Sequence, residues 1–161
     1  MKKTALLPLL AAALCAAPSA MAATYDYLIK GSSCVSTTPG NNGTHGQWGI
    51  FNDNTAAAMT VTCPLPLPNK NYLSATLQVR GYNRNAADPL SCTLLSTDLN
   101  GDLPAAGTAN VPFHATLPMT GNAGLNPVPL TNWISLSCRI PAKTGAGARS
   151  YLTSIYVAAN Y

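Results

Sequence analysis

The sequence predicts an all-β protein, an antiparallel β-sandwich of jelly-roll type with about eight strands and two disulfides. Apolar and polar residues alternate in several short segments, which is the period of a strand with one buried face. Eleven prolines and twelve glycines after residue 22 interrupt these segments, and no segment of that part has a helical period. Cysteines occupy the apolar phase of three segments, so their sulfur atoms are expected to face the core.

The first 22 residues predict a signal peptide that is not part of the fold. Two lysines precede an apolar run, Thr4–Ala17, and the small-residue site Ala20–Ala22 follows. We expect cleavage after Ala22 and a product that is secreted or periplasmic. Cys15 leaves a lipid-anchored alternative open, although Leu14 in front of it is bulky for a lipoprotein signal.

The remaining chain, residues 23–161, suits one domain in length. The whole sequence carries 9 Lys and Arg against 5 Asp, has a formal net charge of +4 and lacks glutamate. Because these charges are scattered and form no basic run, nucleic-acid binding is not expected. No second apolar run reaches the length of a membrane span, so we expect no transmembrane segment in the mature chain.

The four cysteines after the leader are predicted to form disulfides, because their number is even and the chain is expected to be exported. They are Cys34, Cys63, Cys92 and Cys138. The gaps between them are too long for the close pairs of a metal site. Three pairings are possible, and the sequence does not choose among them. We favour Cys34–Cys63 and Cys92–Cys138, because the contexts LSCTL and LSCRI match as neighbouring or facing strands would.

The first half of the domain begins with a strand at Thr24–Lys30, whose two tyrosines and isoleucine share one face. Gly31–Gly46 is rich in Gly, Ser, Thr and Asn and is predicted to be a long loop tied down by its cysteine. Gln47–Asn52 is a short strand in which Trp48 shares the phase of the following isoleucine, as a core residue would. Ala56–Cys63 is the next strand, and the prolines after it place it at an edge or a corner.

The middle of the domain contains the longest alternating segment, Asn71–Tyr82, with Leu73 and three further apolar residues directed inward. Leu90–Ser96 is the strand that carries the third cysteine. Asp98–Asp102 is predicted to be a tight turn with Asn-Gly at its tip. Val111–Leu117 alternates and is predicted to be a strand, at an edge because it contains a proline.

The last part of the domain alternates between turns and strong strands. Met119–Pro129 is rich in Gly, Asn and Pro and is predicted to be a loop. Trp133–Pro141, W-I-S-L-S-C-R-I-P, is the clearest half-buried strand of the chain. Lys143–Arg149 is a turn of small residues, and Ser150–Asn160 closes the domain with a strand.

The order of these segments resembles a set of uncharacterised secreted bacterial proteins with small disulfide-bonded β-domains. The segments that carry the resemblance are G-I-F-N, V-T-C-P-L, a strand ending in R-G-Y-N, S-C-T-L, W-I-S-L-S-C-R-I-P and S-Y-L-T-S-I-Y-V. The resemblance implies the fold and export. It implies no activity and no catalytic residue.

Catalytic chemistry is not expected. The two histidines, His45 and His114, have no aspartate close to them in sequence, and no G-x-S-x-G motif is present. They are interpreted as surface residues, and the protein is predicted not to be an enzyme. No cofactor is expected.

Two oxygen-rich segments are weak candidates for calcium. Asp98, Asn100 and Asp102 alternate as ligands in calcium loops do, and Asp53 lies between two asparagines. Neither segment continues to a distant acidic ligand, so we interpret both as turns and expect no metal site.

Exposed aromatic residues are the candidates for ligand binding. Sugars stack on such rings, and we single out Trp48, Trp133 and Tyr82, with Tyr151 and Tyr156 as further candidates. The sequence therefore predicts a non-enzymatic structural or binding module outside the cytoplasm. It does not identify the partner; the candidates are a polysaccharide and a surface protein. Three alternatives stay open: a carbohydrate-binding domain, a surface filament or layer subunit that assembles by strand addition, and a hydrolase.

Overall fold

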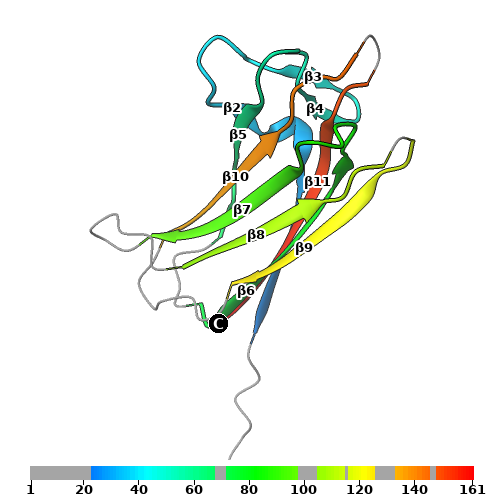
Figure 1. Ribbon diagram of the computed structural model, residues 1–161. Coiled ribbons are helices and arrows are strands. Elements are labelled where there is room, and N and C mark those ends of the chain that lie inside the picture. Colours follow the sequence, from blue (N-terminus) through cyan, green and yellow to red (C-terminus); the bar gives the residue numbers. More distant parts are fainter. Residues whose placement is uncertain (1–22, 68–71, 98–104, 115, 126–132, 146–147) are drawn as a thin grey trace, which may run out of the picture.

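The computed structural model in Figure 1 describes residues 23–67, 72–97, 105–114, 116–125, 133–145 and 148–161. Two antiparallel sheets lie face to face around one core. Among the described residues, no helix is long and apolar enough to cross a membrane. The leader and the expected turn at Asp98–Asp102 lie outside the described residues.

The described residues form eleven strands, where about eight were expected. A single 3-10 turn, η1 (Gly31–Ser33), follows the first strand. The strands are β1 (Thr24–Lys30), β2 (Val35–Ser36), β3 (Thr44–Gly46), β4 (Gly49–Phe51), β5 (Met59–Cys63), β6 (Ser74–Tyr82), β7 (Leu90–Thr97), β8 (Ala105–Val111), β9 (Met119–Leu125), β10 (Trp133–Ile140) and β11 (Tyr151–Asn160).

Each of the two sheets has a simple strand order. Sheet A runs β3-β4-β11-β6-β9, and β1 pairs with β11 beside β4, on the edge opposite β6. Sheet B runs β2-β5-β10-β7-β8. Buried and exposed residues alternate without a break along β5 and along the centre of β6, as strands with one core face require. The predicted antiparallel β-sandwich is therefore confirmed.

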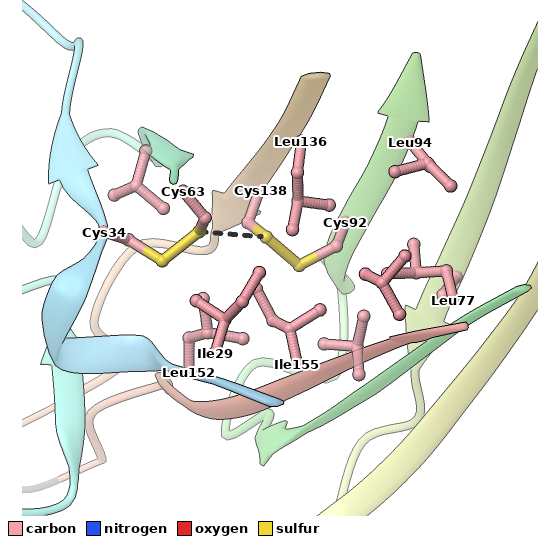
Figure 2. Close-up of a cluster of buried hydrophobic side chains, with 14 of the residues drawn as sticks. Ile29, Cys34, Cys63, Leu77, Cys92, Leu94, Leu136, Cys138, Leu152 and Ile155 are labelled. Carbon is pink, nitrogen blue, oxygen red and sulfur yellow. Dashed lines mark hydrogen bonds between the residues drawn. A yellow bond between two sulfur atoms is a disulfide. The ribbon is translucent and has the colours of Figure 1, made fainter. Parts of the chain in front are cut away.

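Both disulfides lie on the core face of sheet B, side by side (Figure 2). Cys34, immediately before β2, is bonded to Cys63 of β5, and Cys92 of β7 is bonded to Cys138, the residue directly opposite on β10. This is the pairing favoured above. The sulfur atoms of Cys63 and Cys138 are 4.0 Å apart, so the two bridges form one layer across four strands. The aliphatic side chains around this layer come from both sheets and include Ile29, Leu77, Leu94, Leu136, Leu152 and Ile155.

The two sheets approach each other most closely along β8 and β9, which run side by side in Figure 1. A Cβ on Gly121 of β9 would lie 2.2 Å from the carbonyl oxygen of Asn110 in β8. Only glycine allows backbone to pass so close to backbone. This contact closes one side of the sandwich.

The expected strand Val111–Leu117 is wrong. The strand is β8, which ends at Val111, because Pro112 has no N–H to continue the ladder. Phe113 and Leu117, which the alternation placed in the core, are 48% and 57% exposed.

Three smaller expectations also need correction. Met119–Pro129 was expected to be a loop, but its first seven residues form β9, and its last four lie outside the described residues. The expected loop Gly31–Gly46 contains η1, β2 and β3. Leu73 was placed in the core, but it is 55% exposed because the strand begins after it, at Ser74.

Candidate functional site

A row of aromatic side chains crosses the outer face of sheet A. The register places Tyr151 of β11 between Phe51 of β4 and Tyr82 of β6. The strand residues adjacent to these three, Ile50, Gly81 and Leu152, are buried. Because side chains alternate along a strand, the three rings face outward. The Tyr82 and Tyr151 rings stack with centroids 4.3 Å apart, and the Phe51 ring meets Tyr151 edge-on at 5.4 Å. We call this set the aromatic row.

Trp48 stands beside the aromatic row, at the tip of the β3–β4 hairpin. Gly46 and Gly49 close a two-residue turn that presents the indole to solvent, and Trp48 is 67% exposed. Its expected place in the core was wrong. The prediction extended the alternation of inward and outward residues from Trp48 through Gly49 to Ile50. Strand β4 begins only at Gly49, whose φ of +142° departs from regular strand geometry, so Trp48 does not share the phase of the strand.

Polar groups surround these rings. A hollow of about 400 Å³ is lined by Trp48, Arg80, Tyr82, Pro118, Tyr151, Thr153 and Ser154. The Thr153 hydroxyl donates to the carbonyl oxygen of Arg80 over 2.6 Å, which ties β11 to β6 beneath the hollow. The guanidinium carbon of Arg84 lies 5.3 Å from the centre of the Tyr82 ring, within the range of a cation–π contact.

The phenol of Tyr151 stays protonated over the whole physiological range. Partial burial and then a hydrogen bond with Tyr82 raise the pKa of Tyr151 to about 12. The hydroxyl group is therefore a neutral donor and acceptor at the floor of the hollow.

A second hollow of about 450 Å³ lies further along the same face. It is lined by Thr76, Leu77, Gln78, Asn122, Ala123, Gly124 and Tyr156. The side chains of Tyr156, Gln78 and Asn122 occupy directly opposite positions on β11, β6 and β9. The Gln78 amide donates to the Asn122 oxygen over 3.2 Å, and the Tyr156 hydroxyl donates to Asp26 over 2.8 Å. The hydrogen bond with Asp26 raises the pKa of Tyr156.

The structure brings together Trp48, Tyr82 and Tyr151 among the predicted ligand-binding residues, and places Tyr156 in the second hollow. Trp133 opens β10, but its side chain lies outside the described residues. The sequence analysis did not single out Arg80, Gln78 or Asn122 as ligand-binding residues. Their only signal was an outward phase on their strands, which is common to most polar strand residues.

The other candidate residues do not meet in one site within the described part of the chain. His45 places Nδ1 3.0 Å from the carbonyl oxygen of Ser32, and His114 accepts backbone N–H bonds from the two residues beyond Ala115. Asp53 forms an ion pair with Arg149 at 2.8 Å. The weak metal candidates Asp98, Asn100 and Asp102 lie outside the described residues. Within those residues, no group of three or more His, Cys, Asp or Glu side chains is arranged to hold a metal ion.

Comparison with known proteins gives similarity to solved structures alone. No protein-family model matches the chain, and no curated protein matches it. The xylan-binding module CBM15 is 8% identical with a TM-score of 0.48, over 85% of this chain and 97% of the module. An Arthrobacter globiformis T6 isomalto-dextranase complexed with panose is 17% identical with a TM-score of 0.42, over 83% of this chain and 23% of the enzyme. The enzymatically active domain of tailspike protein 4 of bacteriophage CBA120 is 10% identical with a TM-score of 0.41, over 86% and 19% of the two chains.

Proposed function

We propose that this protein is an exported, non-enzymatic carbohydrate-binding module, and that its ligand lies on the outer face of sheet A. One observation carries the proposal: an exposed tryptophan and a stacked tyrosine pair converge on one hollow that also contains polar groups. Sugar rings have an apolar face that packs on aromatic rings and hydroxyl groups that need hydrogen bonds. The two disulfides support a location outside the cytoplasm.

The aromatic groups supply the stacking surface. Trp48 is 67% exposed, and an aromatic ring so exposed beside a hollow is more typical of a binding surface than of a folding requirement. Tyr82 and Tyr151 hold each other in place by stacking, so little rotamer freedom remains to be lost when a ligand binds.

The polar groups match a hydroxyl-rich ligand. Arg80, Thr153 and Ser154 line the hollow, and Tyr151 keeps its proton far above neutral pH. These groups donate and accept hydrogen bonds, as sugar hydroxyl groups require. Arg80 adds a positive charge to the lining and Arg84 lies against the Tyr82 ring, so the hollow suits a sugar with an acidic substituent as well as a neutral one.

The second hollow supports an extended ligand. Gln78 lies four residues from Tyr82 along β6, or about 13 Å at roughly 3.3 Å per residue. Both hollows open on the same face, and Arg80 occupies the outward position between them. The ligand class we propose is a linear polysaccharide that runs along β6 and β11, with several sugar units in contact.

Affinity electrophoresis against a panel of soluble neutral and acidic polysaccharides, followed by calorimetry on each positive, tests the proposal. Trp48→Ala removes the exposed anchor and is expected to weaken binding about 30-fold, the equivalent of about 2 kcal/mol. Val35→Ala is the matched control, because it removes an apolar side chain of similar exposure (64%) from sheet B. Gln78→Ala is expected to weaken binding of the polymer more than binding of a short oligosaccharide.

Three results would contradict the proposal or a part of it. Absence of binding across the panel would remove the carbohydrate function. Binding that Trp48→Ala leaves unchanged would move the ligand to another part of the molecule. Hydrolysis of a bound polysaccharide by the purified protein would contradict the non-enzymatic part.

A further inference from the structure

β1 has one bonded edge and one open edge within the described residues. Its seven residues pair with β11 in unbroken register, from Thr24 opposite Asn160 to Lys30 opposite Ser154. The described strands provide no second partner for it. An open strand edge is a template for another strand unless side chains or geometry block it.

The hydrogen-bond pattern identifies which backbone groups lie on that open edge. The N–H of Tyr161 donates to the carbonyl oxygen of Ala23, so this pair is a hydrogen-bonded pair of the antiparallel ladder. Such pairs alternate with non-bonded ones, so the odd-numbered residues of β1 bond to β11. The carbonyl of Asn160, opposite Thr24, points away from β1 and accepts from the N–H of Leu73, immediately before β6, which agrees with this assignment. The N–H and C=O groups of the even-numbered residues therefore point to the open edge.

The same even-numbered residues carry the exposed side chains of β1. Asp26, Leu28 and Lys30 all face the outside of sheet A, and Leu28 is 72% exposed, the most exposed large apolar residue described. Their order along the edge is acid, leucine, base. This order is complementary to itself when the strand is reversed.

We propose that β1 pairs with β1 of a second copy of this chain in an antiparallel two-fold dimer centred on Leu28. In this register Leu28 lies opposite the partner's Leu28, and Asp26 lies opposite the partner's Lys30 on both sides of it. All of these positions have their backbone groups on the open edge, so each opposite pair exchanges two backbone hydrogen bonds. The interface joins two copies of sheet A into one continuous sheet.

The neighbouring registers fit less well. A shift that places Asp26 opposite Leu28 leaves both charges without a direct cross-strand partner. A lysine at a sheet edge usually blocks pairing, but here the partner's Asp26 neutralises it, and opposite charges across an antiparallel pair are favourable. Ser33 Oγ donates to the carbonyl oxygen of Lys30 over 2.7 Å, which leaves that oxygen a second lone pair for the partner.

The two-fold axis of this dimer is perpendicular to the sheet, so the outer faces of both copies point to the same side. Two copies of the aromatic row then face one surface together. Trp48 and the aromatic row contribute nothing to the β1 edge, whereas Tyr156 of the second hollow donates to Asp26 over 2.8 Å. The dimer is therefore tested by mass and by hydrogen exchange, which do not depend on sugar binding.

Sedimentation equilibrium and amide hydrogen exchange on the purified, disulfide-bonded protein test the dimer. We expect the mass to rise from monomer to dimer between about 10 µM and about 1 mM. Across the same range, the amides of Asp26, Leu28 and Lys30 are expected to become protected. The amides of Tyr25, Tyr27 and Ile29 are expected to be protected at every concentration, because β11 already binds them.

Charge reversal tests the register. Lys30→Asp and Asp26→Lys each place like charges opposite one another twice per dimer, so each is expected to raise the dissociation constant about tenfold or more. The double variant Asp26→Lys/Lys30→Asp restores opposite charges and is expected to recover most of the loss. Leu28→Pro removes an N–H from the open edge without removing a bond to β11, so it is expected to leave a folded monomer.

A monomeric mass over the whole concentration range would overturn the proposal. So would a dimer that forms without alternate-residue protection in β1, because its interface lies elsewhere or its partner strand is different. If the double charge variant is no better than either single one, the Leu28-centred register is wrong.

Discussion

Removing the Cys92–Cys138 bridge is expected to cost this protein a large part of its stability. The bridge closes a loop of 46 residues, and the chain-entropy relation gives about 4 kcal/mol for a loop of that length at 25 °C. The 29-residue loop of Cys34–Cys63 gives about 3.6 kcal/mol by the same relation.

A packing loss adds to the entropic loss. Cys92 and Cys138 are fully buried, and their sulfur atoms belong to a layer that is in contact with Cys63. Replacement by alanine leaves a small void at each position, which costs roughly 1 kcal/mol apiece. The expected total for Cys92→Ala/Cys138→Ala is about 6 kcal/mol, which is comparable to the whole stability of many domains.

Urea unfolding, followed by far-UV circular dichroism and by fluorescence, measures this loss. The partner variant Cys34→Ala/Cys63→Ala is expected to lose slightly less, because its loop is shorter and one of its cysteines retains some exposure. The quadruple variant is expected to differ from the sum of the two, because the bridges touch. A loss in unfolding free energy below about 1 kcal/mol for the Cys92→Ala/Cys138→Ala variant would refute the reasoning, since neither the closed loop nor the buried sulfur atoms would then contribute the expected stability.

Three further predictions concern single residues. Gly121→Ala is expected to destabilise by about 1–3 kcal/mol because its Cβ would meet the Asn110 carbonyl, whereas Gly124→Ala, with open space around it, is expected to be near neutral; thermal unfolding compares the two. Asn52→Ala removes a buried amide that holds the segment after β4 to the end of β10, and is expected to cost about 2–3 kcal/mol in urea unfolding. The pKa of Tyr151 is raised in the folded state, so its contribution to stability is complete below pH 10 and lost as the pH rises towards 12; urea midpoints from pH 8 upward are expected to fall less steeply in Tyr151→Phe.

The parts of the fold that the sequence predicts well are those in which large apolar residues alternate with polar ones. The boundaries of β1 were predicted to the residue, and those of β10 to within one. β8 and β9 were missed because Ala, Gly, Thr and Asn make up most of them, and such residues are more typical of loops. They are strands because the two sheets meet there, and the close approach at Gly121 excludes larger side chains.

The candidate site was less predictable than the fold, because it depends on register. Tyr82 and Tyr151 are far apart in the chain and meet only because β6 and β11 pair with these residues opposite each other. Pairing of that kind is a tertiary property that alternation within one segment does not contain. Trp48 was misplaced for a local reason, since the alternation does not continue through Gly49.

The two outer faces of the sandwich differ in a way that bears on where a ligand binds. The described outward positions of sheet B are mostly Ser and Thr, with exposed or half-buried side chains on β5, β7, β8 and β10. Small hydroxyl residues suit a β-sheet surface in water and offer no anchor for a partner. Sheet A, in contrast, carries the exposed Trp48 and the half-buried rings of the aromatic row on its outer face, although none of these rings fills the core.

Exposing aromatic rings to water is unfavourable. The two disulfide bridges that stabilise this chain lie on its other sheet. The sulfur layer stabilises the sandwich from the core face of sheet B and does not involve the outer face of sheet A. A protein that kept its rings only for packing would direct them inward. Their position on the outer face of sheet A supports the proposed carbohydrate site, and a set of Thr→Ala substitutions on sheet B is expected to leave the proposed binding unchanged.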